Sequence, residues 1–214
     1  MSEVKPWQTL ATAGPLTLKS RGGEYLVLTD GKILMGSKRH GSEDELAIKG
    51  CEALGMRAPQ VLIGGLGFGY TLRKALDLLP SDARVTLSEM SPALVEWNRT
   101  MLAPLAQNPL ADRRVTLELG DVRDSLKRND ATFNAILLDV DNGPFAVSHE
   151  ANAGLYSQKG LKLIHQALAA HGTAIIWSAG DDAAFKRRLD NAHFATTRTW
   201  QIASSQHVLF IAKK

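Results

Sequence analysis

The chain has 214 residues, enough for one α/β domain with a small appendage, and 44% of them are hydrophobic, which allows a sizeable core. Its 25 basic and 22 acidic residues are nearly balanced and scattered, so they indicate no nucleic-acid-binding surface. A single cysteine, Cys51, excludes an internal disulfide and any multi-cysteine metal site. No segment approaches the ~20 apolar residues of a membrane span and no secretory signal is evident, so we expect a cytoplasmic protein without a membrane partner.

The N-terminal segment 15–35 predicts a small antiparallel β meander. It reads PLTLKSRGGEYLVLTDGKILM, in which alternating runs are separated by Gly-Gly and Asp-Gly turn signals. The next stretch, GSKRHGSEDELAIKGCEAL, predicts a helix over 43–54, because Ser42 and Glu45 have the spacing of a capping box. We therefore assign residues 1–57 to an N-terminal domain made of this meander and helix.

From Pro59 onward, strands and helices alternate, which predicts a mostly parallel sheet covered on both faces in a second domain, 58–214. The expected strands are 60–63, 84–88, 114–119, 134–138 and 173–177. The expected helices are 70–79, 92–103, 123–128, 156–170 and 182–191. The final segment, FATTRTWQIASSQHVLFIAKK, holds two strand-like runs without room for a crossover helix, so the last strand must run antiparallel to its neighbour.

Glycines fill the turn between the first strand and the first helix of this second domain. The stretch VLIGGLGFG contains Gly64, Gly65, Gly67 and Gly69, with Leu66 between them. A turn of this kind presents free backbone amide groups to a ligand at the start of a helix. The alternative is that the glycines serve only tight packing.

Acidic residues stand at the ends of the next strands. Glu89 closes the second strand twenty residues past Gly69, where a carboxylate can accept hydrogen bonds from two ribose hydroxyls; the alternative is a charge favoured by a helix N-terminus. Asp121 follows the third strand and either reaches a base edge or caps a helix. Asp139 ends the fourth strand in AILLDVDNGP. The carboxyl ends of strands are the usual ligand site of open α/β sheets, so these positions point at one ligand.

These segments together resemble the class I S-adenosylmethionine-dependent methyltransferase fold and, within it, the spermidine synthase (aminopropyltransferase) family. The resemblance runs from about Leu16 to the end of the chain and rests on VLIGGLGFG, Glu89, the Gly120-Asp121 step, FNAILLDVDNGP, and NAGLYSQKGLKLIHQAL followed by GTAIIWS. It implies a Rossmann-like α/β fold with a seven-stranded, mostly parallel sheet, an antiparallel last strand and a small N-terminal β meander.

The resemblance also implies a ligand, S-adenosylmethionine or its decarboxylated form, and a set of residues that bind it. Glycines of the loop would line the methionine part, Glu89 the ribose and Asp121 the adenine, while Asp139 would orient an attacking amine. The cofactor-binding residues implied are Gly64, Gly65, Leu66, Gly67, Gly69, Glu89, Met90, Asp121, Val122 and Asp139.

Two departures from the family bear on the reaction. Spermidine synthases carry an aspartate inside the glycine loop, where this chain has Leu66, Gly67 and Phe68. They also carry a second acid three residues after the catalytic aspartate, where this chain has Asn142, although Asp141 is close by. The sequence therefore favours methyl transfer from S-adenosylmethionine to a small molecule. The alternatives are aminopropyl transfer from the decarboxylated form and a non-catalytic nucleoside-binding module; a dehydrogenase is disfavoured by the terminal antiparallel hairpin.

Further candidates concern the acceptor substrate and the assembly. His40, Glu43 and Asn142 are candidate substrate residues. The first two belong to the segment LMGSKRHGSEDEL, which we expect to close over the site as a lid; the alternative is an ordinary capped surface helix. Asp139, Asp141 and Tyr156 are candidate catalytic residues, although Tyr156 fits equally as a packing residue at a helix start.

The six histidines are dispersed, so no metal is expected. The edges of the meander suggest a homodimer.

The assignment of Glu89 to the ribose is testable. We expect Glu89→Ala to weaken S-adenosylmethionine binding by about 1 to 3 kcal/mol, because it removes charge-assisted hydrogen bonds. Isothermal titration calorimetry measures this loss, and wild-type affinity in the variant would exclude the ribose role.

Overall fold

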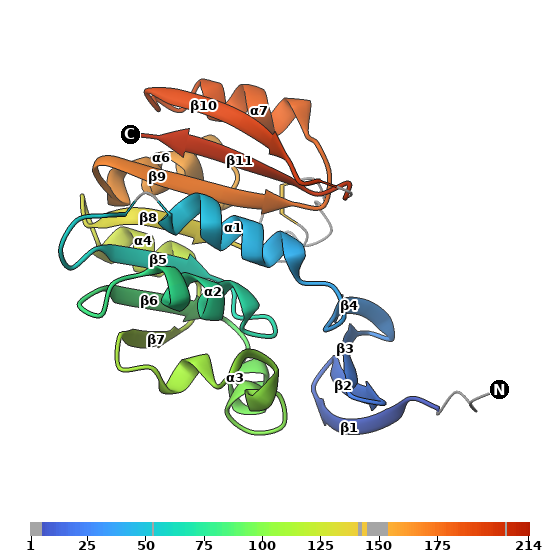
Figure 1. The fold of residues 1–214 in the computed structure, drawn as a ribbon. Coiled ribbons are helices and arrows are strands. Elements are labelled where there is room, and N and C mark those ends of the chain that lie inside the picture. Colours follow the sequence, from blue (N-terminus) through green and yellow to red (C-terminus); the bar gives the residue numbers. More distant parts are fainter. Residues whose placement is uncertain (1–5, 53, 141–142, 145–153, 204) are drawn as a thin grey trace. The chain divides into compact units, whose positions relative to one another are not determined.

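The computed structural model describes residues 6–52, 54–140, 143–144, 154–203 and 205–214 (Figure 1). The chain forms two compact units, Met1–Gly41 and Ser42–Lys214. Helix α1 (Gly41–Cys51) thus groups with the larger unit, whereas the sequence analysis joined it to the meander. The reason is packing, because Leu46 and Ala47 of α1 are fully buried in a core of the larger unit.

The N-terminal unit is a four-stranded antiparallel sheet, as predicted. Its strands follow in sequence order as β1 (Gln8–Ala13), β2 (Leu16–Arg21), β3 (Glu24–Thr29) and β4 (Lys32–Gly36). Leu18 and Val27 pair across β2 and β3 and are fully buried. This cross-strand pair is the apolar centre of a small sheet whose other residues are mostly half-exposed.

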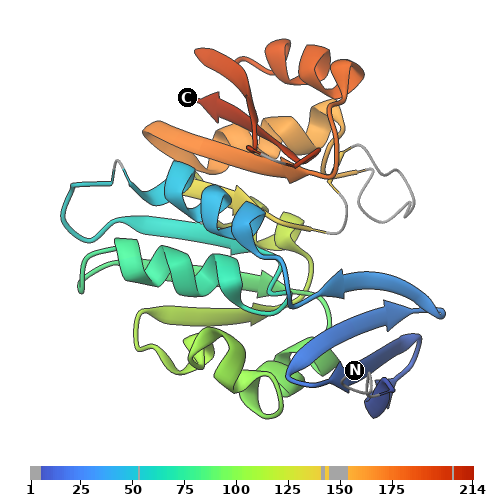
Figure 2. The same ribbon diagram turned by 45° about the vertical axis from the view of Figure 1, so that its right-hand side comes forward.

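The larger unit contains a seven-stranded sheet in the order β10-β11-β9-β8-β5-β6-β7 (Figures 1 and 2). Strands β7, β6, β5, β8 and β9 are parallel, and β11 runs antiparallel to both β9 and β10. The predicted fold class is confirmed, including the antiparallel last strand. The strand bounds are β5 (Gln60–Gly64), β6 (Arg84–Glu89), β7 (Val115–Leu119), β8 (Phe133–Leu138), β9 (Leu168–Ser178), β10 (Thr196–Gln201) and β11 (Val208–Lys213).

Helices cover both faces of this sheet. Figure 1 shows α1 and α2 in front of the sheet and α4 and α6 behind it. The bounds are α2 (Tyr70–Leu78), α3 (Pro92–Arg99), α4 (Val122–Arg128), α6 (Gln158–Ala167) and α7 (Ala183–Asp190), with short 3-10 turns η1 (Ala103–Ala106) and η2 (Pro109–Ala111).

Several helix ends differ from the sequence-based prediction. Helix α1 begins at Gly41, and the Ser42 hydroxyl donates to Glu43 Oε2 at 2.6 Å, so Ser42 lies inside the helix and not at its cap. Helix α3 ends at Arg99, because Thr100 has non-helical backbone angles, φ −122° and ψ −98°, and its N–H donates to the Trp97 carbonyl. Helix α6 begins at Gln158, because Ser157 caps it by accepting from the Gly160 N–H at 3.2 Å.

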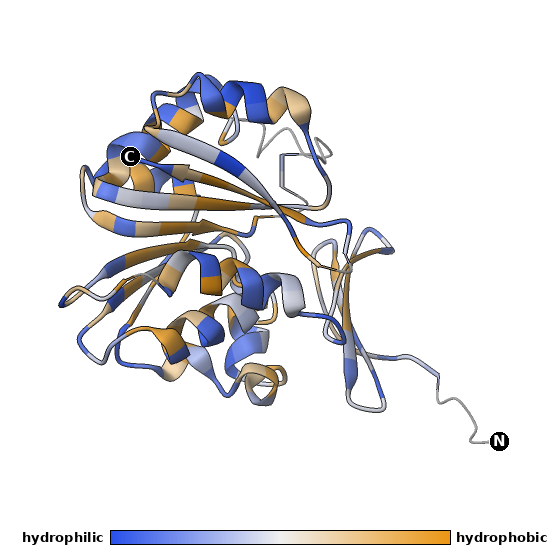
Figure 3. Ribbon diagram, turned by 45° about the horizontal axis from the view of Figure 1, so that its top comes forward, coloured by the Kyte–Doolittle hydropathy of each residue, from blue (hydrophilic) through white to orange (hydrophobic). Residues whose placement is uncertain are grey.

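Each face of the sheet has its own apolar core. Along β8, Ala135 and Leu137 face the core under α1 and α2, whereas Ile136 and Leu138 face the core under α4, α6 and α7. Both sides of this central strand are apolar because both are covered. Figure 3 shows hydrophobic stretches along the central strands and hydrophilic stretches on the helices.

Helix α1 lies directly on strand β8. A Cβ added at Gly50 would lie 2.1 Å from Cδ2 of Leu137, a distance that leaves no room for any side chain. This close contact holds α1 against the centre of the sheet. Within the described residues, no helix has the length and apolar character needed to span a membrane.

The core behind the sheet gives a stability prediction. Phe185 of α7 is fully buried and makes edge-to-face contacts with Tyr156 and Phe210, with ring centroids 5.7 and 4.9 Å away. We expect Phe185→Ala to lower the free energy of unfolding by about 3 to 5 kcal/mol, because it removes buried apolar surface and leaves a cavity. Urea denaturation followed by circular dichroism measures the change. Leu78→Ala, at a side chain that is 39% exposed, is the control and should cost far less.

Candidate active site

The candidate site lies at the carboxyl edge of the large sheet, where β5, β6, β7 and β8 end. Backbone hydrogen bonds tie the segments that leave these strands: Gly65 N–H donates to Ser88 O at 2.9 Å, Gly120 N–H to Glu89 O at 2.8 Å, and Asp139 N–H to Gly64 O at 2.9 Å. Because these bonds continue the sheet beyond the strands, the residues that follow are held on a rigid support.

The glycine loop is shaped by two close approaches. Gly65 has φ +95°, and a Cβ there would lie 2.1 Å from the backbone oxygen of Asp139, so only glycine fits. Gly69 has φ +85°, and a Cβ there would lie 3.2 Å from Oδ1 of Asn98. Asn98 also donates to the Gly67 carbonyl at 2.9 Å. The loop is therefore fixed by packing and at the same time presents backbone rather than side chains.

The two bulky residues of the loop turn away from the crevice. Leu66 and Phe68 are each 4% exposed, and Leu66 belongs to the core under α1 and α2. This inward packing explains why apolar residues interrupt the glycines. It also means that the loop itself contributes no charged side chain to a ligand.

Glu89 connects the glycine loop to helix α3. Its carboxylate is 8% exposed, with Oε2 accepting from the Leu66 N–H at 2.8 Å and Oε1 accepting from the Ser91 N–H at 2.7 Å. These two bonds fix the orientation of the Glu89 carboxylate. The ribose role stays a prediction, and the helix-terminus role weighed as its alternative is present as well.

Apolar side chains flank Glu89 at the same edge. Met90 is 59% exposed, and Leu119, which pairs with Glu89 across β6 and β7, is 57% exposed. Large apolar side chains this exposed at the edge of a crevice provide a surface on which a flat base can lie.

Asp121 adopts the helix-capping role that was the alternative in the sequence analysis. It accepts from the Arg123 N–H at 2.8 Å at the start of α4, and both of its oxygens contact the Arg123 guanidinium. Hydrogen bonding from Arg123 holds the pKa of Asp121 below its usual range. Val122 packs into the core, where a Cβ on Gly64 would meet it at 3.0 Å. The adenine role of both residues stays a prediction.

Asp139 is the chemically distinctive group of the site. Burial, reinforced by the negative charge of Glu43, raises the pKa of Asp139 to about 7, although a hydrogen bond from the Thr71 hydroxyl at 3.1 Å favours the charged form. Burial, Glu43 and Asp44 likewise raise the pKa of Tyr70. The first turns of α1 and α2 therefore bring their polar groups to Asp139, and Glu43 lies within electrostatic range of the site.

Other sequence-predicted residues are placed differently. Tyr156 is 5% exposed and packs against Phe185 in the core behind the sheet, on the opposite face from Asp139, which fits its packing alternative; its catalytic role stays a prediction. Asp141 and Asn142 lie outside the described residues. His40 belongs to the N-terminal unit, and its substrate role stays a prediction. Among the side chains that the structure describes, no group of three or more His, Cys, Asp or Glu is arranged to hold a metal ion.

The sequence analysis missed Thr71, which donates to Asp139, and an aromatic pair at the end of the neighbouring strand β9. Thr71 lies two residues past the last loop glycine, at the first turn of α2. Trp177 lies at the end of β9, and His207, just before β11, stacks on it with ring centroids 4.8 Å apart. The rule that functional side chains follow the carboxyl ends of parallel strands would have found Trp177, had it been applied to the fifth strand.

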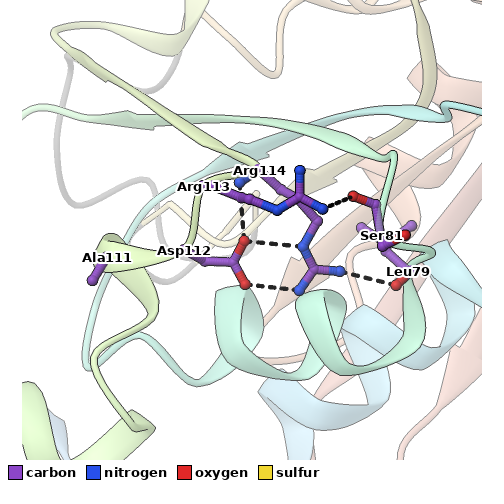
Figure 4. Close-up of a pocket in the computed structure, with 6 residues that line it drawn as sticks. All are labelled: Leu79, Ser81, Ala111, Asp112, Arg113 and Arg114. Carbon is purple, nitrogen blue, oxygen red and sulfur yellow. Dashed lines mark hydrogen bonds and ion pairs between the residues drawn. The ribbon is translucent and has the colours of Figure 1, made fainter.

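A separate cavity of about 590 Å³ opens at the amino ends of β6 and β7 (Figure 4). Arg114 holds Asp112 in a two-point ion pair, with nitrogen–oxygen distances of 3.0 and 2.8 Å, and donates to the Leu79 carbonyl at the end of α2 at 2.9 Å. Hydrogen bonding from Arg114 lowers the pKa of Asp112 to about 2. Asp112 and Arg114 neutralise each other, and Arg114 caps the end of α2. We therefore assign them a structural role, at the edge of the sheet opposite Asp139.

Comparison with known proteins supports the fold resemblance. No family model matches the chain. The chain is 28% identical over 187 residues to polyamine aminopropyltransferase 2 of Pseudomonas aeruginosa, covering 86% of this chain and 50% of that protein. It aligns with the crystal structure of spermidine synthase from Thermotoga maritima at a TM-score of 0.73 and 18% identity, over 99% of this chain and 72% of that one. The chain has a spermidine synthase-like fold.

Two further structures extend this comparison. A spermidine synthase in complex with the transition-state analogue AdoDATO aligns at a TM-score of 0.77 with 18% identity, over 99% of this chain and 73% of that one. The crystal structure of the CurJ carbon methyltransferase aligns at a TM-score of 0.57 with 13% identity, over 80% of this chain and 53% of that one. The spermidine synthase-like fold therefore lies within the broader class I methyltransferase fold. The chain spans half the length of the curated relative that it matches.

The electrostatic coupling between Glu43 and Asp139 is testable. We expect Glu43→Gln to lower the pKa of Asp139 from its value of about 7, because one of the two causes that raise it is removed. Thr71→Val should raise the pKa instead, because it removes a hydrogen bond to the charged form. Carboxyl chemical shifts in an NMR titration report both directions. Asp124→Asn, at an exposed ion pair with Lys127, is the control, and a shift of Asp139 in that variant but not in Glu43→Gln would contradict the coupling.

Proposed function

We propose that this chain is a transferase in which an amine acceptor attacks a carbon bound to a sulfonium, and that the reaction is aminopropyl transfer from decarboxylated S-adenosylmethionine. The observation that carries the proposal is Asp139, a carboxyl at the crevice whose pKa is raised to about 7 by burial and by Glu43. A group with a pKa near the working pH is suited to accept a proton from an amine.

The chemistry requires few groups. The amine nitrogen forms a bond to the aminopropyl carbon, the carbon–sulfur bond breaks, and its electron pair stays on sulfur as the neutral thioether of 5′-methylthioadenosine. The thioether needs no protonation, so no acid is required. The nitrogen loses one proton, and Asp139 is placed to receive it. The remaining contribution of the protein is positioning, which the hydrogen-bonded loops at the carboxyl edge supply.

The residues of the site fit a sulfonium nucleoside. Glu89 is oriented by two backbone N–H groups at the end of β6, and a carboxylate can accept hydrogen bonds from ribose hydroxyls. Met90 and Leu119 offer exposed apolar surface for the base. The bound nucleoside supplies the sulfonium that makes the adjacent carbon electrophilic, and the glycine loop makes room for its tail.

The choice of the decarboxylated donor rests on charge and on the relatives. Glu43, Asp44 and Asp139 approach one another around the first turns of α1 and α2, as their shared effect on Tyr70 and Asp139 indicates. This negative potential disfavours a donor that carries a carboxylate and favours cationic amines. The relative named polyamine aminopropyltransferase 2 supports the same reaction, although this chain spans half of that protein.

Methyl transfer from S-adenosylmethionine is the second candidate, and it was the reading that the sequence favoured. One observation supports it: Leu66, Gly67 and Phe68 stand where an acid of the loop would hold the amino group of the decarboxylated donor. The structure adds that Leu66 and Phe68 are buried, so the loop contributes no charged side chain to hold that amino group.

The leaving product separates the two reactions. We expect incubation with decarboxylated S-adenosylmethionine and 1,4-diaminobutane to yield 5′-methylthioadenosine, detected by liquid chromatography and mass spectrometry. Asp139→Asn should lower this rate by about 10²-fold or more, because the proton acceptor is lost. Asp124→Asn, at an exposed surface pair, is the matched control and should keep the wild-type rate.

Other outcomes contradict the proposal in distinct ways. S-adenosylhomocysteine formed from S-adenosylmethionine would establish methyl transfer instead. Nucleoside binding without product from either donor would indicate the non-catalytic binding module.

A further inference from the structure

Asn98 joins helix α3 to the glycine loop. Its side chain is 1% exposed, and its Nδ2 atom donates to the Gly67 carbonyl and to the Leu94 carbonyl, at 2.9 Å in both cases. The bond to Leu94 lies within α3 and holds the side chain against its own helix. The bond to Gly67 joins residues that are 31 positions apart in the chain, so it is a tertiary contact between α3 and the loop.

The loop residues that Asn98 reaches form a tight turn. The Gly69 N–H donates to the Leu66 carbonyl at 2.8 Å, which closes a four-residue β-turn. Gly67 has φ +54° and Phe68 has a negative φ, which is the sign pattern of a type II′ turn. The Gly67 carbonyl belongs to the central peptide group of this turn. Asn98 therefore sets the direction in which that peptide group points.

Two buried polar side chains hold this turn, one from the end of β6 and one from α3. Glu89 accepts from the Leu66 N–H at 2.8 Å, and Asn98 donates to the carbonyl of the next residue. The Asn98 amide also fills the room that Gly69 leaves, since a Cβ there would lie 3.2 Å from Oδ1. A buried carbonyl that loses its donor is costly, so the shape of the turn depends on Asn98.

Gly67 is the residue of this turn that a ligand can reach. It is partly exposed, whereas Leu66, Phe68 and Gly69 are buried. Asn98 is itself buried and bonds Gly67 from the protein side, so it acts on a ligand only through the loop. A loop that is already fixed in its bound conformation needs less ordering when the ligand arrives, and this raises affinity.

Resting on the proposed sulfonium nucleoside donor, we propose that Asn98 is a positioning residue of the donor site and presets the turn at Gly67 for the tail that the sulfonium carries. The nucleoside part lies at Glu89 and at the exposed apolar side chains beside it, away from this peptide group. Asn98 therefore contributes to recognition of the tail and not of the nucleoside.

Calorimetry with and without the tail tests this inference. The probes are S-adenosylmethionine and its decarboxylated form, which carry the tail, and 5′-methylthioadenosine, which lacks it. Asn98→Leu keeps the size of the side chain and removes its N–H donors. We expect it to weaken binding of the donor that the wild type prefers by about tenfold, and to leave binding of 5′-methylthioadenosine close to wild type. In turnover, the same variant should raise the KM of the donor with little change in kcat.

A second variant and a matched control separate positioning from a merely structural role. In Asn98→Asp, an ionised carboxylate only accepts, whereas a protonated carboxyl has an O–H donor. Donor affinity relative to wild type should therefore be lost at higher pH and return as the pH falls. Asn129→Leu is the control, because Asn129 makes the same kind of bond within α4, to the Ser125 carbonyl at 2.8 Å, and should bind the donor as the wild type does. If Asn98→Leu fails to fold, Asn98→Asp decides.

Unchanged donor affinity in Asn98→Leu, or an equal loss for 5′-methylthioadenosine, would overturn the inference. So would an equal loss in Asn129→Leu, or a wild-type protein that binds none of the probes. The proposed function fails separately. If the wild type prefers S-adenosylmethionine and Asn98→Leu loses that affinity but not the affinity for 5′-methylthioadenosine, aminopropyl transfer is wrong and the role of Asn98 stands.

Discussion

The close passage of two chain segments at Gly65 is the constraint on which the site depends. The backbone oxygen of Asp139 occupies the place that a Cβ of residue 65 would need, at 2.1 Å. Only a residue without a side chain lets β5 and β8 remain adjacent as their chains diverge. This adjacency holds the glycine loop against Asp139 at the carboxyl edge, at the point where the sheet reverses its strand order.

Burial of Asp139 has a thermodynamic consequence for the whole unit. Its pKa of about 7 in the folded state exceeds the value of 3.8 expected for an unfolded chain, so the folded protein holds this proton more tightly. The stability contributed by this group is therefore present below pH 3.8 and is lost as the pH rises to about 7. The folded protein is therefore less stable when Asp139 is charged, at the position where a proton acceptor is needed. Such perturbed pKa values are common at functional sites.

Much of the fold could be predicted from the sequence because its signals are local and repeated. Apolar runs such as VLIGG and NAILLD read as strands buried on both faces, and the short terminal hairpin required an antiparallel strand. Helix ends were less predictable, since Ser42 matched a capping box yet its hydroxyl bonds Glu43 inside α1. Side chains at strand ends were predicted where they are acidic, as with Asp139.

What the sequence could not supply was the direction of side chains and the partners they meet. Tyr156 follows a plausible loop, but its ring lies on the far face of the sheet because the core around Phe185 holds it. Thr71 carries no local signature, and only the packing of α2 reveals its place beside Asp139. Such long-range neighbours depend on the assembled sheet, which no short pattern encodes.

The antiparallel strand β11 joins the exposed edge of the sheet to its centre. It lies between β9 and β10, although it follows both in the chain, and β10 meets the rest of the sheet through it. Strand β10 is mostly exposed, whereas β11 is almost wholly buried. Because β10 pairs with no other strand of the described chain, loss of β11 would leave β10 without a partner and would open one edge of β9.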